Sequence, residues 1–491
     1  MNPPATFLSQ FREKYLKTAL VGGLLVYGST ELLSLFHALT TFWITLFWGT
    51  VSVTVSYFVW KKKWVSIFVQ NALLFWRDCT RYEQILLTLI GIFYLLPLFF
   101  LAIYAPPNNT DSANYHLARV VFWLQNQNVE HYPTVYIHQL YNNVFSEYIL
   151  LHIMALSSWE DYLVNTVQTF AMVGSVLTIS LIARLFGLSR QMQWLVALLQ
   201  LTLPIGILES TTTQNDYLAN FLFLGFLYFG LKFIFNPSTF RFSDVFWMAS
   251  ALALGGFTKY PVLIFAFPIC VWVGMVSLTR RSFGFSLKTF AMTAAMLVLV
   301  FTPFFYRNYQ LFGHVLKPPN NSHPLFTQEI PTERVSIGTV VSGVVKNMAL
   351  HLGLPHQGYN RQIDKAVVKI HQIIGVPIND PQLSFDPYYT RFTIQEDMSG
   401  NPWHFVLIMS TLVWVLVVYI PRKNVSSDLK GGWILAICAV VGFVIYSALI
   451  KFQCHHTRLQ IPFFSMGFVW TAIVLKNTSD ILPKTLGIFY L

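Results

Sequence analysis

The feature that most constrains this chain is a series of apolar windows that recur along its 491 residues. A helix of about 20 apolar residues can cross the hydrocarbon core of a bilayer, and it satisfies its own backbone polar groups there. The sequence therefore predicts an all-α polytopic membrane protein. We expect about twelve transmembrane helices, at 18–36, 41–60, 84–104, 161–183, 191–209, 217–235, 243–257, 261–278, 286–305, 403–420, 432–450 and 460–476.

The amino-acid composition agrees with this prediction. Charged residues make up 11% of the chain, against about 25% in soluble globular domains, and 55% of the residues are hydrophobic. These values exclude an ordinary cytosolic enzyme, a disordered chain and a nucleic-acid binder. The 4 cysteines form no CxxC pair, so we expect neither a disulfide nor a zinc site.

The distribution of Lys and Arg predicts how the chain is oriented. If the N-terminus lies in the cytoplasm, most basic residues of the short connections also lie on that side, as the positive-inside rule requires. The net charge of +11 then reflects cytoplasmic anchors more than an acidic partner. Both termini are expected inside, and the first apolar segment is expected to stay as a membrane helix, because MNPPATFLSQFREKYLK and the run after it show no signal-peptide cleavage site.

The connections divide the chain into four predicted regions. Residues 1–83 form a helical hairpin, alternatively a re-entrant one, with a cytoplasmic linker. Residues 84–305 form a membrane core that includes a first long outer loop at 105–160. Residues 306–402 form a small outer cap with short helices, and residues 403–491 form the C-terminal membrane helices.

The first outer loop carries a polar cluster just after the third predicted span. In APPNNTDSANYHLARVVFWL, two prolines end the span, and apolar residues then recur at helical spacing from Ser112. This pattern predicts an amphipathic helix in the membrane interface. Asp111 begins that helix, either as its N-cap or as a general base at the membrane surface, and the two roles are compatible. Tyr115, His116 and Arg119 follow on the next turns.

Further polar clusters fall on the same predicted face. Asp216 begins the sixth span after TTTQN, as an N-cap or as a second functional acid. Lys259 interrupts apolar sequence in GGFTKYP, where a lysine costs on the order of 3 kcal/mol unless it snorkels at a helix end or is paired. Arg307 and Asn308 close the ninth span in TPFFYRNYQLFG, on the side that the positive-inside rule disfavours. Arg458 opens the last span in CHHTRLQIP.

The histidines of the chain show no metal-binding spacing. His455 and His456 are adjacent, so both cannot face one ligand set on a helix, and no metal site is expected there. Motifs such as HExxH are missing from 306–402. His456 is a secondary site candidate, whereas Glu396 and Asp397 are expected to cap the following span.

These motifs resemble the GT-C superfamily of membrane glycosyltransferases. The chain looks most like the branch of protein O-mannosyltransferases and aminoarabinose (lipid A) transferases, and especially its bacterial relatives. Their motifs are D-S-x-x-Y-H-L, T-K-x-P, P-W-x-x-R-N-x-x-x-x-G and R-[YL]-x-x-P. Here Phe304 replaces the tryptophan, and Ser112 follows Asp111 where many members carry an Asp-Glu pair. The similarity covers most of the chain after the first two spans.

The resemblance implies a GT-C-like helix arrangement and inverting transfer of a sugar from a polyprenyl-phosphate donor. The acceptor would be a protein, lipid or glycan on the periplasmic face of a bacterial inner membrane. Asp111 would act as general base, Asp216 would orient the acceptor or a sugar hydroxyl, and Lys259, Arg307 and Arg458 would bind the donor phosphate. No cofactor is required, and a divalent cation, which some GT-C branches use, is not expected.

Two other classes of function share the predicted spans. A transporter or lipid-linked sugar flippase also carries ionisable residues in the membrane, near the midplane, whereas the candidates here gather on one face. Many transporters contain internal repeats, and none is visible in this sequence. A polysaccharide polymerase or ligase also uses lipid-linked sugars. The identity of the sugar and of the acceptor is left open.

Overall fold

The computed structural model describes residues 3–316, 331–418 and 427–479, and their secondary structure is helical. Within these residues, β-type backbone pairing is limited to two isolated bridges, Pro331 to Ile450 and Ser384 to Phe452. The predicted all-helical fold class is thus confirmed for the described part of the chain. The last two residues of the predicted span 403–420, and the C-terminal end of 403–491, lie outside it.

In the described residues, 8 helices are long and apolar enough to cross a membrane. Each coincides with a predicted window, which supports a polytopic membrane protein. Three of the other windows contain shorter or divided helices, such as the 17 residues of α13 (Phe242–Thr258), and the window 460–476 contains the 19 residues of α21 (Ile461–Ser479), which is not among the candidate spans. The number of about twelve spans therefore stays a prediction. The 8 helices are Leu8–Leu35, Thr41–Lys61, Arg81–Tyr104, Thr166–Leu185, Asp216–Phe235, Pro261–Arg280, Phe283–Phe312 and Leu429–Leu449.

The chain divides into two compact units, which we call unit 1 and unit 2. Neither unit is continuous in sequence. Three of the divisions fall inside the long helices α9 (Thr166–Leu185), α12 (Asp216–Phe235) and α15 (Phe283–Phe312). Unit 1 comprises Met1–Gly174, Ser210–Leu218 and Met296–Pro318, and unit 2 comprises Ser175–Glu209, Ala219–Ala295 and Pro319–Leu491.

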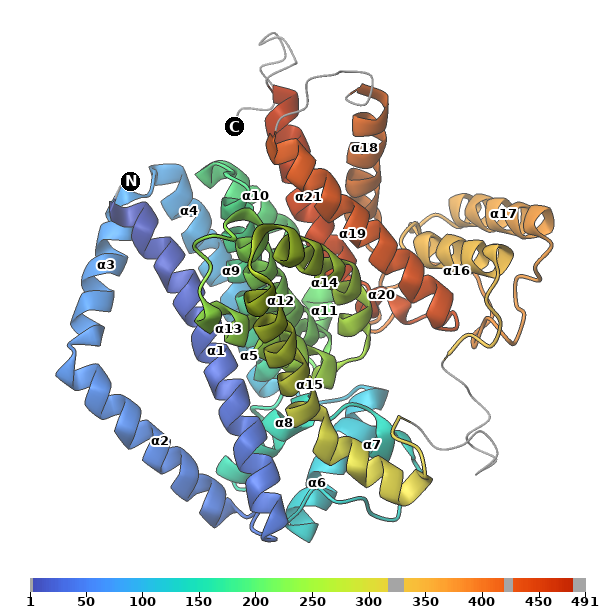
Figure 1. The fold of residues 1–491 in the computed structure, drawn as a ribbon. Coiled ribbons are helices and arrows are strands. Elements are labelled where there is room, and N and C mark those ends of the chain that lie inside the picture. Colours follow the sequence, from blue (N-terminus) through green and yellow to red (C-terminus); the bar gives the residue numbers. More distant parts are fainter. Residues whose placement is uncertain (1–2, 317–330, 419–426, 480–491) are drawn as a thin grey trace. The chain divides into compact units, whose positions relative to one another are not determined.

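Unit 1 contains the N-terminal helices and the first long loop, 105–160. The long helices α1 (Pro3–Leu35) and α2 (Thr41–Lys61), drawn in blue in Figure 1, both pack against α3 (Trp64–Asp78) and α8 (Phe145–Leu156). Each is long enough to span a bilayer, which favours two spans over a re-entrant hairpin. The other elements are α4 (Arg81–Ile90), η1 (Gly91–Leu95), α5 (Leu96–Tyr104), η2 (Ser112–His116), α6 (Leu117–Asn126) and α7 (His138–Tyr141).

Unit 2 contains a helical bundle built around α21 (Ile461–Ser479). Its neighbours include α19 (Ser427–Leu449), α18 (Pro402–Val418) and α10 (Arg190–Leu201), and α14 (Pro261–Arg280) packs on α19 and α21. Figure 1 shows α18, α19 and α21 running side by side. The short helices α11 (Pro204–Glu209) and α20 (His456–Leu459) contact each other in the same unit.

Part of the second long loop forms two cap helices in unit 2, α16 (Ile337–Ala349) and α17 (Gln357–Ile374), which lie together in Figure 1. A small core of Ala349, Val367, Tyr388 and Phe452 holds them. The helix α16 also packs on α19, where a Cβ atom added at Gly343 would lie 2.2 Å from the Ser447 carbonyl oxygen. Because that atom belongs to the backbone, the close approach of the two helices requires glycine.

Replacing Gly343 by Ala should therefore destabilise unit 2, because the new methyl group forces α16 away from α19. We expect a loss of about 1–3 kcal/mol, the usual range for overpacking, measured as a lower unfolding midpoint in detergent. Gly274→Ala in α14 is the matched control, since no atom lies within 4 Å of an added Cβ there. Equal midpoints for the two variants would contradict the close packing.

Candidate functional site

The candidate base Asp111 lies in unit 1, at the start of the predicted interfacial helix. This helix opens with the π-helical turn η2, a type of turn that is frequent at functional sites, and continues as α6. Asn109 caps it, because Asn109 Oδ1 accepts a hydrogen bond from the Ser112 backbone N–H at 2.6 Å. Asp111 makes no side-chain capping bond. Capping therefore does not explain the presence of an acid at this position.

The Asp111 carboxylate is partly exposed and contacts polar groups from two segments. Its Oδ2 accepts hydrogen bonds from Tyr115 Oη at 3.3 Å and from Gln214 Nε2 at 3.2 Å. The hydroxyls of Ser112 and Thr213 lie 2.5 Å apart. Unit 1 thus brings the DSANYHL and TTTQND motifs together, and a phenol and an amide orient the carboxylate. We call Asp111 and these neighbours the Asp111 site.

Asp216 belongs to the same unit as the Asp111 site. It is the first residue of α12 and is 3% exposed, a position where the helix dipole favours a carboxylate. The helix α9 holds the segment 210–218 in place, because Thr169 Oγ1 donates to the Ser210 carbonyl at 2.7 Å and the Leu218 N–H donates to Gln168 Oε1 at 3.0 Å. The role of Asp216 as a second acid stays a prediction.

His116 and Arg119 are fully buried around Glu147 of α8. His116 Nδ1 and Arg119 Nη1 lie 2.8 and 3.3 Å from Glu147 Oε1. Arg119 also donates to three backbone carbonyls between residues 138 and 143, at 2.6 to 3.1 Å. These contacts give Arg119 a structural role. Glu147 was not a predicted candidate, since it lies in an apolar stretch and its partner His116 is 31 residues away.

Arg307 of α15 is bound to Glu31 of α1 in a buried network of unit 1. Its Nη1 and Nη2 donate to the two carboxylate oxygens at 2.9 and 2.8 Å, and Nη2 also donates to Tyr148 Oη at 2.9 Å. This is the bidentate geometry in which guanidinium groups bind most strongly. A donor phosphate would have to share the Arg307 guanidinium with Glu31 or displace Glu31 from it. Phosphate binding by Arg307 therefore stays a prediction. The neighbouring Asn308 pairs with His131 Nε2 at 2.9 Å.

Lys259 and Arg458 both lie in unit 2. Lys259 separates α13 from α14 with an extended backbone, at φ −159° and ψ 126°, and is partly exposed. Arg458 lies in α20, with Nη1 3.8 Å from Asp397 Oδ1. Burial, and then four neighbouring basic side chains that include Lys259 and Arg458, hold the pKa of His456 well below its usual range. Lys259 and Arg458 are thus both near enough to His456 to lower its pKa.

His456 is part of a buried polar network that joins α16 to the segment before α21. Its Nδ1 lies 3.3 Å from Asn347 Oδ1, which also accepts from Gln460 Nε2 at 2.9 Å. His351 Nε2 lies 2.8 Å from Gln460 Oε1, and its Nδ1 lies 3.3 Å from Asn401 Nδ2. Burial lowers the pKa of His351 to about 4, so this imidazole is neutral at neutral pH.

An apolar groove of about 620 Å³ runs along α18 in unit 2. Its walls come from α18 and from the C-terminal end of α16, and they are almost entirely hydrocarbon. Such a lining suits a lipid chain. The lining residues are Met348, Leu352, Phe405, Val406, Met409, Ser410, Val413, Trp414 and Val417.

Comparison of the chain with family models, curated proteins and solved structures finds no match. The resemblance to GT-C enzymes therefore depends on the sequence motifs, and the membrane character depends on the apolar helices. Glycosyl transfer, the bacterial inner membrane and the periplasmic site stay proposals.

Removing the partner of Arg307 should destabilise unit 1. Glu31→Gln leaves a buried guanidinium without its carboxylate, which costs about 3–5 kcal/mol in comparable pairs, and the unfolding midpoint should fall accordingly. Glu13→Gln in the same helix is the control, because the Glu13–Lys17 pair is 25% and 31% exposed and such pairs contribute at most about 1 kcal/mol. Equal shifts in the two variants would contradict a structural role for the Arg307 pair.

The buried amine of Lys346 should make stability depend on pH. It donates to Ile378 O and Ser384 Oγ at 3.2 and 2.5 Å, and burial lowers its pKa from 10.5 to about 8. The folded state therefore disfavours the charged amine. This penalty is fully present below pH 8 and disappears as the pH rises from about 8 to 10.5, so the wild type should gain up to about 3 kcal/mol over that window.

The check is the difference in unfolding free energy between wild type and Lys346→Met as a function of pH. Lys365→Met on α17 is the control, since Lys365 is exposed. Wild-type and Lys346→Met profiles that run parallel between pH 8 and 10.5 would exclude this titration.

Proposed function

We propose that the protein is a membrane glycosyltransferase that moves a sugar, with inversion, from a polyprenyl-phosphate donor to an acceptor hydroxyl. The observation that carries the proposal is the Asp111 site. A partly exposed carboxylate lies just after a candidate transmembrane helix and is oriented by Tyr115 and Gln214. The carboxylate belongs to the DSANYHL segment, one of the motifs that resemble GT-C enzymes.

Asp111 is the proposed general base. Its carboxylate takes the proton of the acceptor hydroxyl while the acceptor oxygen attacks the anomeric carbon of the sugar. The bond between that carbon and the phosphate oxygen breaks, and the polyprenyl phosphate leaves as an anion. The proton on Asp111 then passes to solvent. Asp216 is proposed to orient the acceptor or a sugar hydroxyl.

The donor phosphate is proposed to bind to Lys259 and Arg458. Both cations lie in unit 2 and lower the pKa of His456, and fixed cations stabilise negative charge that develops on a leaving group. Arg307 is a third proposed ligand, in competition with Glu31. The apolar groove along α18 has the chemistry that a prenyl chain requires.

The chemistry is proposed for the periplasmic face of a bacterial inner membrane, with both chain termini in the cytoplasm. The support for this orientation is the excess of Lys and Arg in the connections assigned to the cytoplasm. No cofactor is needed for the proton transfer or for the displacement of the phosphate.

Asp111→Asn should lower the transfer rate by at least about 100-fold, because general bases typically contribute about 10² to 10⁴. The measurement is transfer of a radiolabelled sugar from polyprenyl phosphate to acceptors in a membrane extract, by purified protein. Asp161→Asn is the control. Asp161 is an exposed acid in the loop after α8, so this variant should keep wild-type activity. Near wild-type transfer by Asp111→Asn would remove Asp111 as the base.

A flux assay in liposomes separates this function from the competing one. A transporter or flippase would move the lipid-linked sugar across the bilayer and form no covalent product. Flux without transfer, in liposomes that contain only the purified protein, would contradict the proposal.

A further inference from the structure

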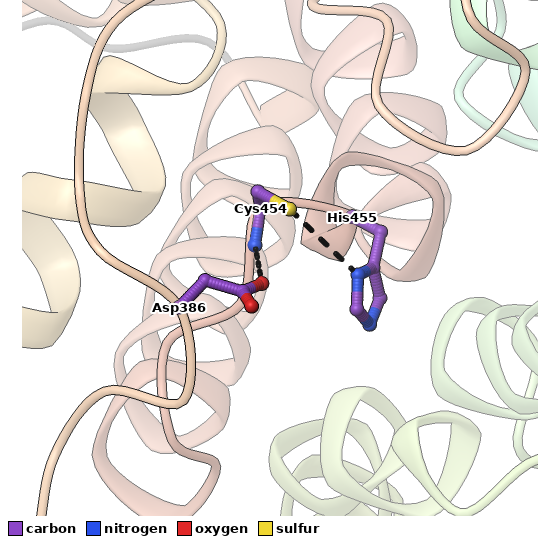
Figure 2. Close-up of side chains that lie close together, drawn as sticks. All are labelled: Asp386, Cys454 and His455. Atoms are coloured by element: carbon purple, nitrogen blue, oxygen red, sulfur yellow. Dashed lines mark hydrogen bonds between the residues drawn. The ribbon is translucent and has the colours of Figure 1, made fainter. Parts of the chain in front are cut away.

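Three side chains with different donor atoms meet in unit 2, just before α20 (Figure 2). Cys454 and His455 are neighbours in sequence, and Asp386 precedes Cys454 by 68 residues. A carboxylate oxygen, the thiol sulfur and an imidazole nitrogen all lie within 4.8 Å of one another. Oxygen, sulfur and nitrogen donors are the set that Zn²⁺ accepts in proteins.

Backbone pairing between two segments builds this cluster. The Phe452 N–H donates to the Leu383 carbonyl and the Phe385 N–H donates to the Phe452 carbonyl, each at 2.9 Å. Next along the same pair of segments, the Cys454 N–H donates to Asp386 Oδ2, also at 2.9 Å. The carboxylate and the thiol are therefore held side by side by the fold, and the Asp386 carboxylate is oriented by a backbone bond of the kind that supports metal ligands.

The three donor atoms can reach the spacing of a bound ion by side-chain rotation. Tetrahedral Zn²⁺, with bonds of about 2.0–2.3 Å, places its donor atoms roughly 3.3–3.6 Å apart. Cys454 Sγ and His455 Nδ1 are 3.9 Å apart, and all three donor atoms lie within 4.8 Å of one another, so the side chains must close around the ion when it binds. None of the three residues is fully buried, which leaves an entry path for an ion.

The charges of the cluster suit a divalent cation. An ionised carboxylate and a thiolate together carry two negative charges. Metal binding displaces the proton of the Cys454 thiol, as it does at thiol ligands generally. Met398 Sδ lies 3.8 Å from Cys454 Sγ, and Arg391 contacts Met398.

We propose that Asp386, Cys454 and His455 bind a divalent transition-metal ion of the Zn²⁺ type. Three protein ligands leave the fourth position of a tetrahedral ion open to water or to a further ligand. The site is independent of the proposed transfer reaction. The sequence pattern predicts no metal here. The prediction considered only whether the adjacent His455 and His456 could bind one ion, and it could not include Asp386, which comes from a distant segment.

The test is titration of metal-stripped, full-length protein in detergent with Co²⁺, which replaces Zn²⁺ and reports its ligands by absorption. Wild type should develop a thiolate-to-cobalt charge-transfer band with one equivalent of metal, and added Zn²⁺ should abolish it. Cys454→Ser should lose the band. Asp386→Asn and His455→Gln should weaken Co²⁺ binding by at least about 10- to 100-fold, the loss that follows removal of outer-shell partners.

The matched controls are Cys270→Ser and Cys438→Ser, in α14 and α19, which should keep the band because these thiols lie outside the cluster. A second measurement uses wild type alone: Zn²⁺ should slow alkylation of Cys454, read by mass spectrometry, and leave the other thiols unchanged. The proposal is overturned if the band is missing in wild type, if it survives Cys454→Ser, or if Zn²⁺ fails to protect Cys454.

Discussion

The hydrocarbon core of a bilayer offers no hydrogen-bond partner, so each polar group placed in it must find one within the protein. The apolar helices of this chain meet that requirement for their backbones. The side chains meet it through networks that join distant segments. In unit 1 Arg307 is held by Glu31 and Tyr148, and in unit 2 Asn347 is joined to Gln460. These networks join helices that lie far apart in the sequence.

The helices and the helix start at Asp111 were predictable from sequence because their signals are local, whereas the contact of Asp111 with Gln214, 103 residues away, was not. An apolar run of spanning length marks each of the 8 candidate spans, and two prolines followed by helical spacing mark the start of the segment at Asp111. Glu31 and Glu147 were not predictable. Their partners lie 276 and 31 residues away, and one sequence contains no information about such pairings.

Arg307 shows what the position of a charged residue in the sequence does and does not predict. The orientation predicted from the positive-inside rule places Arg307 on the disfavoured side of the membrane, so we expect a specific anion for its guanidinium. Charge alone does not distinguish a carboxylate of the same chain from the phosphate of a substrate. The structure supplies Glu31, whereas at Asp111 it supplies a phenol and an amide. The two sites were predicted by similar reasoning and differ in the chemistry of their neighbours.

The donor and the acceptor of each hydrogen bond in the buried network of unit 2 can be assigned in turn. Neutral His351 accepts from Asn401 through Nδ1 and so donates through Nε2 to Gln460, whose amide nitrogen must then donate to Asn347 Oδ1. The same oxygen accepts from His456, which therefore carries its proton on Nδ1. The tautomer of one histidine thus sets that of another, and the unprotonated Nε2 of His456 is left buried without a hydrogen-bond partner among the described residues.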